Sequence, residues 1–324
     1  MSGERVGTVT HQARVVTHQA RVAAPAGVVY AVLADAATMP LYFPPSIHVE
    51  RLHFDGAQER LRVWTLNDGQ LTAWTAWRHL DPVERRITFR QDLPSSPPSQ
   101  LHGQVSLRDE GARGTVLEMR YGLTGAAGLP NCPPSAHQAA SGDPCSRLTG
   151  LKSFAEHWTR LDDLVLSFED SIRINGPAEL AYDLLYRAAD WPGHIPHITR
   201  ADLDEDTPGV QRLTLHTLTE DGPATTTSVR LCFPHAGRIV FKQTTPWAPL
   251  AAHTGEWSII PDENGVTVTC QQSVVLREDP LTAAPGTTTH LAFARRRVRT
   301  LLGRHSQALL TLAKQHAESA VRML

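Results

Sequence analysis

The stretch VAAPAGVVYAVLADAATMPLYFPPS (Val22–Ser46) returns in altered form as INGPAELAYDLLYRAADWPGHIPHI (Ile174–Ile198). The two stretches align without a gap at an offset of 152 residues, and eight of their 25 positions are identical. The same offset places RRITFRQ (Arg85–Gln91) on GRIVFKQ (Gly237–Gln243). Each copy is about 150 residues long, the size of a whole domain and too long for a solenoid repeat. The chain is therefore predicted to be a tandem duplication of one domain.

Each copy is expected to contain the same elements in the same order. An alternating strand comes first, and a helix follows that begins at Pro25 or Pro177, where a missing backbone N–H costs nothing. A short helical piece interrupted by prolines comes next, and about six alternating segments separated by turn residues follow it. A closing helix is expected at about residues 147–163 in the first copy and 287–319 in the second.

This order is that of the START-like helix-grip fold, an α+β architecture in which a curved antiparallel sheet wraps a long C-terminal helix around an internal cavity. The predicted domains are residues 1–164 and 165–324. The segment 124–146, rich in Pro, Gly and Ser, is expected to be a loop inside the first domain. The heptapeptide VTHQARV occurs twice, and its second copy (16–22) is the expected first strand. The first copy (9–15) is expected to be a disordered arm or a duplication without a role.

The composition excludes several classes of function. The chain has 324 residues with a formal net charge of -2, which gives no electrostatic reason to expect nucleic-acid binding. No stretch approaches the apolar length of a membrane span, and the N-terminus lacks the apolar core of a signal peptide, so a cytoplasmic location is expected. The four cysteines lie far apart without a CxxC pair, and no histidine motif has metal-ligand spacing. No metal and no cofactor are expected.

Three segments of the second copy carry a family resemblance: DWPGHIPHI (Asp190–Ile198), TTSVRLCFPHAGRIVFKQ (Thr226–Gln243) and HTGEWSI (His253–Ile259). The chain resembles the di-domain aromatase/cyclases of bacterial type II polyketide synthases. The first copy has looser counterparts of these segments at 38–47, 72–91 and 101–107.

The resemblance implies where the site lies. In single-domain relatives a Ser-x-Arg pair on a pocket strand faces the bound polyketide, and this pattern falls on Ser228 and Arg230. At the 152-residue offset Arg78 corresponds to Arg230, whereas Ala76 replaces the serine. Catalytic roles are thus expected for Arg78, Ser228 and Arg230. The residues expected to bind substrate are aromatic or amide side chains: Tyr42, Trp74, Trp77, Gln91, Trp191 and Gln243. His102 and His253 have no histidine at the matching position, so the duplication does not support an acid–base role for them.

The resemblance also implies a reaction. A poly-β-ketone delivered by an acyl carrier protein would fold in the cavity, close its first ring between carbons 7 and 12 by an intramolecular aldol reaction, and lose water to become aromatic. The other subunits of a type II polyketide synthase would be partners. A cavity that holds the chain in one conformation lowers the entropic barrier, and an arginine can stabilise the developing oxyanion. The second domain, which has Trp191, Ser228 and Arg230, is the expected catalytic one.

Two alternative functions use the same fold. A non-catalytic carrier of hydrophobic ligands would also suit a cavity with one arginine, and it would be distinguished by purely apolar walls. A Rieske oxygenase subunit would need clustered Cys and His ligands, which the sequence lacks. The basic run around Arg295–Arg297, with Arg299 and Arg304, is expected to be a solvated helix face, and a landing patch for an acidic carrier protein is the alternative.

Overall fold

The computed structural model describes residues 15–93, 99–125, 144–220, 222–277 and 288–322. The first copy of VTHQARV apart from Val15, and most of the loop expected at 124–146, lie outside these ranges. By the contacts between their residues, the chain divides into two compact units. The first unit comprises residues 1–37 and 49–156, and the second comprises 38–48 and 157–324. A short piece of the first copy, which includes Tyr42, thus belongs to the second unit.

Each half of the chain forms a seven-stranded antiparallel sheet, and the strand order is the same in both: the first strand lies beside the last, and the others follow in reverse order. The first sheet contains β1 (Val16–Val22), β2 (Ser46–Phe54), β3 (Gln58–Asn67), β4 (Gln70–Asp81), β5 (Arg86–Leu93), β6 (Ser99–Asp109) and β7 (Thr115–Gly125). The second contains β8 (Val165–Ile174), β9 (Ile198–Thr207), β10 (Val210–Thr219), β11 (Gly222–Phe233), β12 (Arg238–Thr245), β13 (Leu250–Asp262) and β14 (Gly265–Leu276). The strands predicted from alternation are confirmed, including β1 at the second copy of VTHQARV.

The main helices follow a similar order in both copies, and the short helical turns differ in place and number. The first copy has α1 (Ala26–Ala34), η1 (Ala36–Thr38), α2 (Met39–Tyr42), η2 (Gly111–Arg113), α4 (Pro144–Glu156), η3 (Trp158–Arg160) and α5 (Leu161–Leu164). The second has α6 (Ala178–Tyr186), η4 (Ala188–Gly193), η5 (Pro234–Ala236) and α7 (Thr288–Arg322). The closing helix of the first copy, predicted as continuous over 147–163, is interrupted after Glu156 by a 3₁₀ turn. Both first helices start one residue after the proline at which they were predicted to begin, so each proline is the N-cap.

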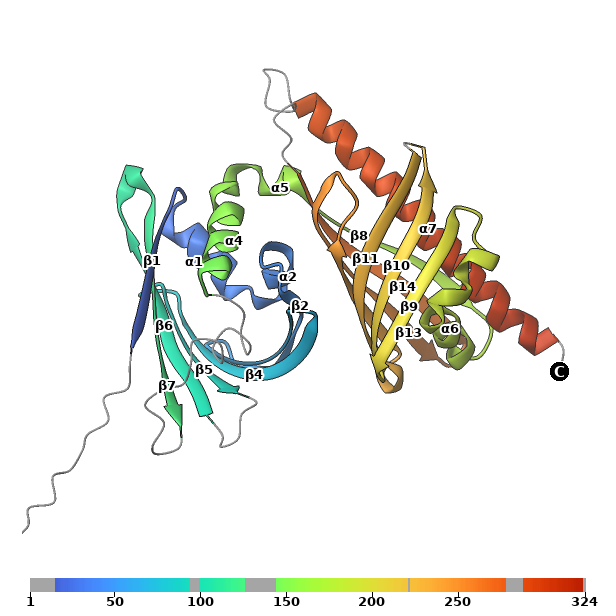
Figure 1. Cartoon of the computed structure of the whole chain (residues 1–324), viewed down its shortest axis with the longest axis horizontal. Coiled ribbons are helices and arrows are strands. Elements are labelled where there is room, and N and C mark those ends of the chain that lie inside the picture. The colour runs from blue at the N-terminus through green and yellow to red at the C-terminus, as the bar shows by residue number, and fades with distance from the viewer. Residues whose placement is uncertain (1–14, 94–98, 126–143, 221, 278–287, 323–324) are drawn as a thin grey trace, which may run out of the picture. The chain divides into compact units, whose positions relative to one another are not determined.

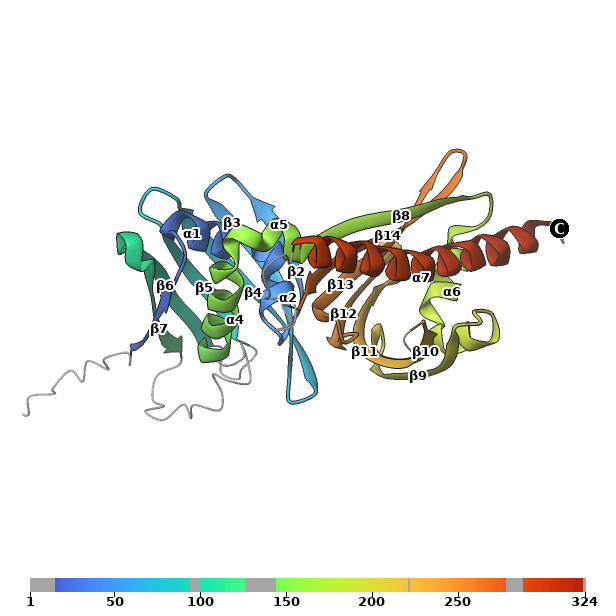
Figure 2. The ribbon, with the colours of Figure 1, turned by 90° about the horizontal axis from the view of Figure 1, so that it is seen from above.

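Helix α7 runs along the second sheet, which curls around it (Figures 1 and 2). One stripe of the helix, which includes Leu309, Leu310 and Ala313, is buried in a core shared with α6 and several strands. Hydrogen bonds also connect the helix to β8. The Asp170 carboxylate accepts hydrogen bonds from the Arg299 guanidinium and from the Ser306 hydroxyl, both at 2.7 Å. Burial opposes the charge of Asp170, but these hydrogen bonds prevail and lower its pKa. The carboxylate is therefore stably ionised and holds α7 in register over the sheet.

A glycine lies beside a phenylalanine at the same place in both sheets: Gly103 pairs with Phe89, and Gly255 pairs with Phe241. A Cβ built on Gly255 would overlap the Phe241 ring and lie 2.7 Å from the Gln271 carbonyl oxygen. Because the carbonyl belongs to a paired strand, it cannot easily move away. The glycine lets the phenylalanine ring lie flat against the sheet next to the cavity described below.

Gly255→Ala is expected to destabilise the second unit by about 1–3 kcal/mol, the usual cost of overpacking. Urea denaturation followed by circular dichroism measures the effect. Gly193→Ala is the matched control, because a Cβ at Gly193 meets nothing within 4 Å. Equal stabilities of the two variants would contradict the packing argument.

Candidate functional site

Arg78 and Arg230, which correspond at the 152-residue offset, both bind backbone carbonyls at the end of a helix. Arg78 on β4 donates to the carbonyl oxygens of Leu33 and Ala34 at 3.0 and 2.8 Å, at the end of α1. Arg230 on β11 donates to the carbonyl oxygens of Leu185 and Tyr186, at the end of α6. The acceptors are themselves 152 residues apart, so the predicted equivalence of the two arginines is confirmed. A cation at the C-terminus of a helix satisfies its free carbonyls and opposes the negative end of its dipole.

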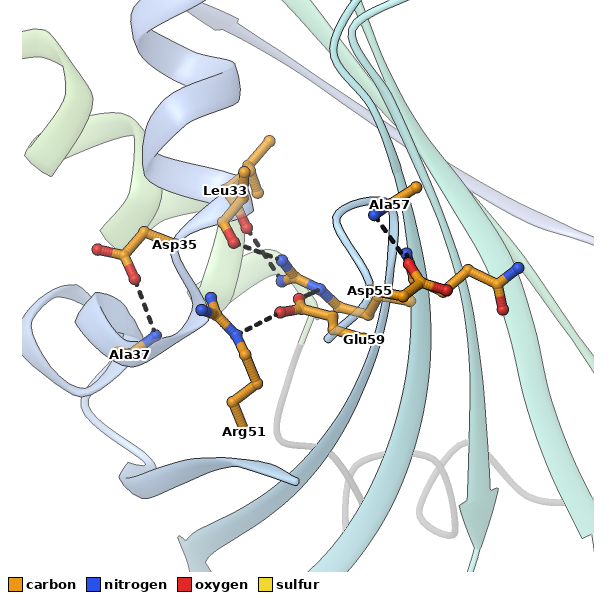
Figure 3. Close-up of polar contacts among 10 residues, drawn as sticks. Leu33, Asp35, Ala37, Arg51, Asp55, Ala57 and Glu59 are labelled. Carbon is orange, nitrogen blue, oxygen red and sulfur yellow. Dashed lines mark hydrogen bonds and ion pairs between the residues drawn. The ribbon is translucent and has the colours of Figure 1, made fainter. Parts of the chain in front are cut away.

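The third partner of each arginine differs between the copies. Arg78 forms an ion pair with the fully buried Glu59 at 2.7 Å, and Glu59 also accepts from Arg51 at 2.9 Å (Figure 3). At the matching position Arg230 donates to the neutral amide of Gln211 at 2.7 Å. Glu59 thus neutralises the cation of the first unit, while Arg230, which is 2% exposed, lacks such a carboxylate within its direct contacts. Burial lowers the pKa of Arg230, but an arginine stays charged at neutral pH.

A cavity of about 290 Å³ lies inside the second unit, between the sheet and α7. Its apolar wall is mainly aromatic and aliphatic: Trp191, Leu213, Phe241, Trp247, Trp257 and Leu309. Four elements, β11, β12, β13 and α7, and the turn before β9 contribute polar lining groups that include His197, Ser228, Arg230, Gln243, His253 and His305. The size is at the lower end for small-molecule sites, and the mixture of apolar walls with a few converging polar groups is typical of them.

The predicted site residues of the second copy are brought together. Ser228, Arg230, Gln243 and Trp191 all line the cavity. Ser228 and Gln243 are direct neighbours across β11 and β12, and the buried Oε1 of Gln243 has no hydrogen-bond partner within the described chain. The Arg230 guanidinium lies over the Trp191 ring, 5.4 Å from its centroid, while the Trp191 indole donates to the Leu184 carbonyl at 3.0 Å. Three of the five N–H groups of Arg230 are used by described protein acceptors, and the other two have no acceptor among the described residues.

The predicted aromatic site of the first copy is not assembled in this way. Trp74 and Arg78 share one face of β4, whereas Trp77 lies on the other face. There the Arg60 guanidinium carbon lies over the Trp77 ring, 5.5 Å from its centroid. Trp74 donates to the Thr65 hydroxyl at 3.3 Å, and Tyr42 belongs to the second unit. Gln91 is buried beside Ala76, and its Nε2 has no partner within the described residues. Arg78 and Trp77 border an open depression of about 430 Å³.

Three histidines of the cavity were not identified from the sequence as a group. The Nε2 atom of His197 lies 3.0 Å from Nδ1 of His305, and Nε2 of His253 lies 2.9 Å from Oε1 of Gln272. Burial lowers the pKa of all three, to about 4 for His253 and to about 3 for His305. The imidazoles are therefore neutral at pH 7. No local motif could have found them, because their segments meet only in the folded chain.

These depressed pKa values predict how stability depends on pH. An imidazole in an unfolded chain has a pKa of about 6.5, so the unfolded state binds more protons than the folded state between about pH 4 and 6.5. The free energy of unfolding is expected to fall as pH is lowered from 7 to 5. Urea titrations across this range measure the slope, and His253→Gln should make it shallower. His316→Gln, at an exposed position of α7, should leave the slope unchanged. A slope that His253→Gln does not alter would contradict the prediction.

Comparisons with known sequences show the family to which the chain belongs. The sequence matches the family described as "Polyketide cyclase / dehydrase and lipid transport" over residues 13–143 and 165–312. It is 32% identical to the granaticin polyketide synthase bifunctional cyclase/dehydratase of Streptomyces violaceoruber over 300 residues, which are 92% of each chain. It is also 32% identical to the actinorhodin polyketide synthase bifunctional cyclase/dehydratase of Streptomyces coelicolor, over 92% of this chain and 93% of the relative.

Solved structures extend the similarity to both copies at once. The crystal structure of the di-domain ARO/CYC BexL from the BE-7585A pathway matches 94% of this chain and 99% of its own, with a TM-score of 0.81 and 36% identity. The crystal structure of the di-domain ARO/CYC StfQ from the steffimycin pathway also matches 94% of this chain and 99% of its own, with a TM-score of 0.78 and 29% identity. The tandem helix-grip fold predicted from the 152-residue repeat is thereby confirmed, and the chain belongs to the polyketide cyclase/dehydrase family as one of its two-domain members.

Proposed function

We propose that the second unit binds a poly-β-ketone in its cavity, closes the first ring between carbons 7 and 12 by an intramolecular aldol reaction, and dehydrates that ring to an aromatic one. The observation that carries the proposal is the lining of the cavity. An apolar wall surrounds Ser228, Arg230, Gln243 and three histidines, whereas a carrier of hydrophobic ligands needs apolar walls alone. The first unit is proposed to support the second.

The chemistry follows from where these groups lie. The apolar wall favours one folded conformation of a flexible chain, and such positioning lowers the barrier to ring closure. The remaining N–H groups of Arg230 can donate to a ketone oxygen as it becomes an enolate or alkoxide, and the surrounding low dielectric strengthens this interaction. The Ser228 hydroxyl and the Gln243 amide add neutral hydrogen-bonding groups that orient other ketones of the chain.

An acyl carrier protein and other polyketide synthase subunits are the proposed partners, and the cytoplasm is the proposed location. Within the described residues, no helix has the length and apolarity needed to cross a membrane. The basic run on α7 gives little support to a landing patch. Arg295 donates to the carbonyls of Asp163 and Val165, Arg299 to Asp170, and Arg304 to Glu220.

Reconstitution with a minimal type II synthase and its acyl carrier protein tests the proposal. The expected result is that the protein diverts material from spontaneous shunt products to a product with the first ring closed and aromatic. The double variant Ser228→Ala/Gln243→Leu should lower the fraction of ring-closed, aromatic product without changing thermal stability. Ser167→Ala, at an exposed position of β8, is the control. An unchanged product distribution with the wild-type protein would support the carrier function.

A further inference from the structure

Two histidines that are far apart in sequence form a hydrogen-bonded pair beside the cavity. His197 lies in the turn before β9, and His305 lies on α7. Nε2 of His197 is 3.0 Å from Nδ1 of His305, and the rings meet edge to face with centroids 5.3 Å apart. The Trp191 ring also meets the His305 ring edge to face, with centroids 6.4 Å apart. All three line the cavity, so the pair is held rigidly at a wall that a bound polyketide would touch.

The pairing determines which atom of His305 is available. Because Nδ1 is engaged by His197, Nε2 is the nitrogen that His305 can offer to the cavity. Both rings are neutral at pH 7, as burial lowers both pKa values. One of the two facing nitrogens must then donate and the other accept. When Nδ1–H of His305 donates to His197, Nε2 carries a lone pair. When His197 donates instead, Nε2 carries a proton. The pair can therefore offer either a base or an acid at one position.

The other titratable and charged groups around the cavity are less suited to this role. Arg230 on β11 cannot give up its proton at neutral pH. Nε2 of His253 on β13 is occupied by Gln272, and its Nδ1 is buried. Arg304 on α7 pairs with Glu220 at 2.7 Å. His305 combines a neutral ring, an orientation fixed by its hydrogen bond to His197 and a place in the lining of the cavity.

We infer that His305 is the acid–base catalyst of this cavity and that His197 is the positioning residue that orients its ring and selects its tautomer. This inference rests on the proposed function. In ring closure, Nε2 of His305 takes a proton from a methylene between two ketones, and the C–H electron pair forms the enolate. The enolate carbon bonds to the distant ketone carbon, whose C=O pair becomes an alkoxide. The imidazolium returns its proton to the alkoxide, so the step has no net proton change.

The same nitrogen serves the loss of water. It removes a second proton beside the new hydroxyl-bearing carbon, and the C–H pair forms a C=C bond while the C–O bond breaks. The departing hydroxide takes the proton from the imidazolium and leaves as water. Both reactions need a group that can take a proton and return it at one position, and the His305 imidazole is regenerated in each step.

The first test replaces the catalyst itself. His305→Gln is expected to lower the yield of ring-closed product in the reconstituted synthase by about 10²–10⁴-fold, the usual contribution of acid–base catalysis. The wild-type protein is also expected to catalyse deuterium exchange at the methylene of a soluble 1,3-diketone in D₂O, and His305→Gln should abolish this exchange. The exposed His316→Gln is the control, with unchanged yield and exchange. Full activity of a folded His305→Gln protein overturns the inference.

The second test leaves His305 in place and changes its partner. In His197→Asp a carboxylate accepts from Nδ1–H and stabilises the imidazolium, which raises the pKa of His305. Because a base works only when deprotonated, the loss of exchange activity on acidification should occur at a higher pH in His197→Asp than in His197→Asn. If His305 is not the base, the two pH profiles should superimpose, and that result overturns the inference. This comparison decides the question if His305→Gln does not fold, and a wild-type protein that fails to change the product distribution would disprove the proposed function instead.

Discussion

Arg78→Met is expected to lower the free energy of unfolding of the first unit by about 3–5 kcal/mol, because it leaves the fully buried Glu59 carboxylate without its closest cation. The Leu33 and Ala34 carbonyls at the end of α1 lose their donor in the same step. Arg230→Met should cost the second unit less, about 1–3 kcal/mol, since its side-chain partner is the neutral Gln211. Urea denaturation with hydrogen–deuterium exchange of peptides from each unit separates the two effects.

The effects on activity should fall in the opposite order. Arg230→Met removes a donor from the cavity and should lower ring closure by about 10²–10³-fold, whereas Arg78→Met should lower it only as far as it lowers the folded fraction. Adding Glu59→Gln to Arg78→Met copies the neutral partner of the second unit and should recover part of the stability. If the single variants lose equal stability and the double variant recovers none, the buried charge is not the cause.

Lys242→Met is expected to destabilise the second unit by about 3 kcal/mol or more, because three backbone acceptors, two of them in buried hydrogen bonds, lose their shared donor. Lys242 is 4% exposed, and its Nζ donates to the carbonyls of Phe43, Pro44 and Ser46 at 3.0, 2.8 and 2.7 Å. These carbonyls follow α2, in a proline-rich stretch that cannot pair them within a helix. The lysine thus anchors residues 38–48 within the second unit.

Amide exchange over residues 38–48 measures this effect directly and should become faster in Lys242→Met. The matched control is Lys314→Met, which also removes a lysine that donates to a backbone carbonyl, that of Arg173 at 2.7 Å. Its side chain is 34% exposed, so water can replace it and little stability should be lost. Unchanged protection of residues 38–48 in Lys242→Met would contradict the anchoring role.

The repeat in the sequence predicted most of the fold because the signals that it uses are local. Alternation of apolar residues depends on neighbours two positions apart, and the prolines before α1 and α6 act within one helical turn. A gapless register between two diverged copies then equated Arg78 with Arg230 without any knowledge of their contacts. The interruption after Glu156 was missed, because the helical pattern continues across it.

By itself, then, the sequence determined that this protein consists of two helix-grip domains of one family, and its spacing predicted that Ser228 and Arg230 share one face of a strand of the second. The tertiary structure decided what those residues contact. Hydrogen bonds such as those of His305 with His197, Arg230 with Leu185, and Lys242 with Phe43 join segments between 45 and 199 residues apart. Their geometry depends on how far each sheet curves and where each helix lies on it, and these are set by packing of the whole core rather than by any local pattern.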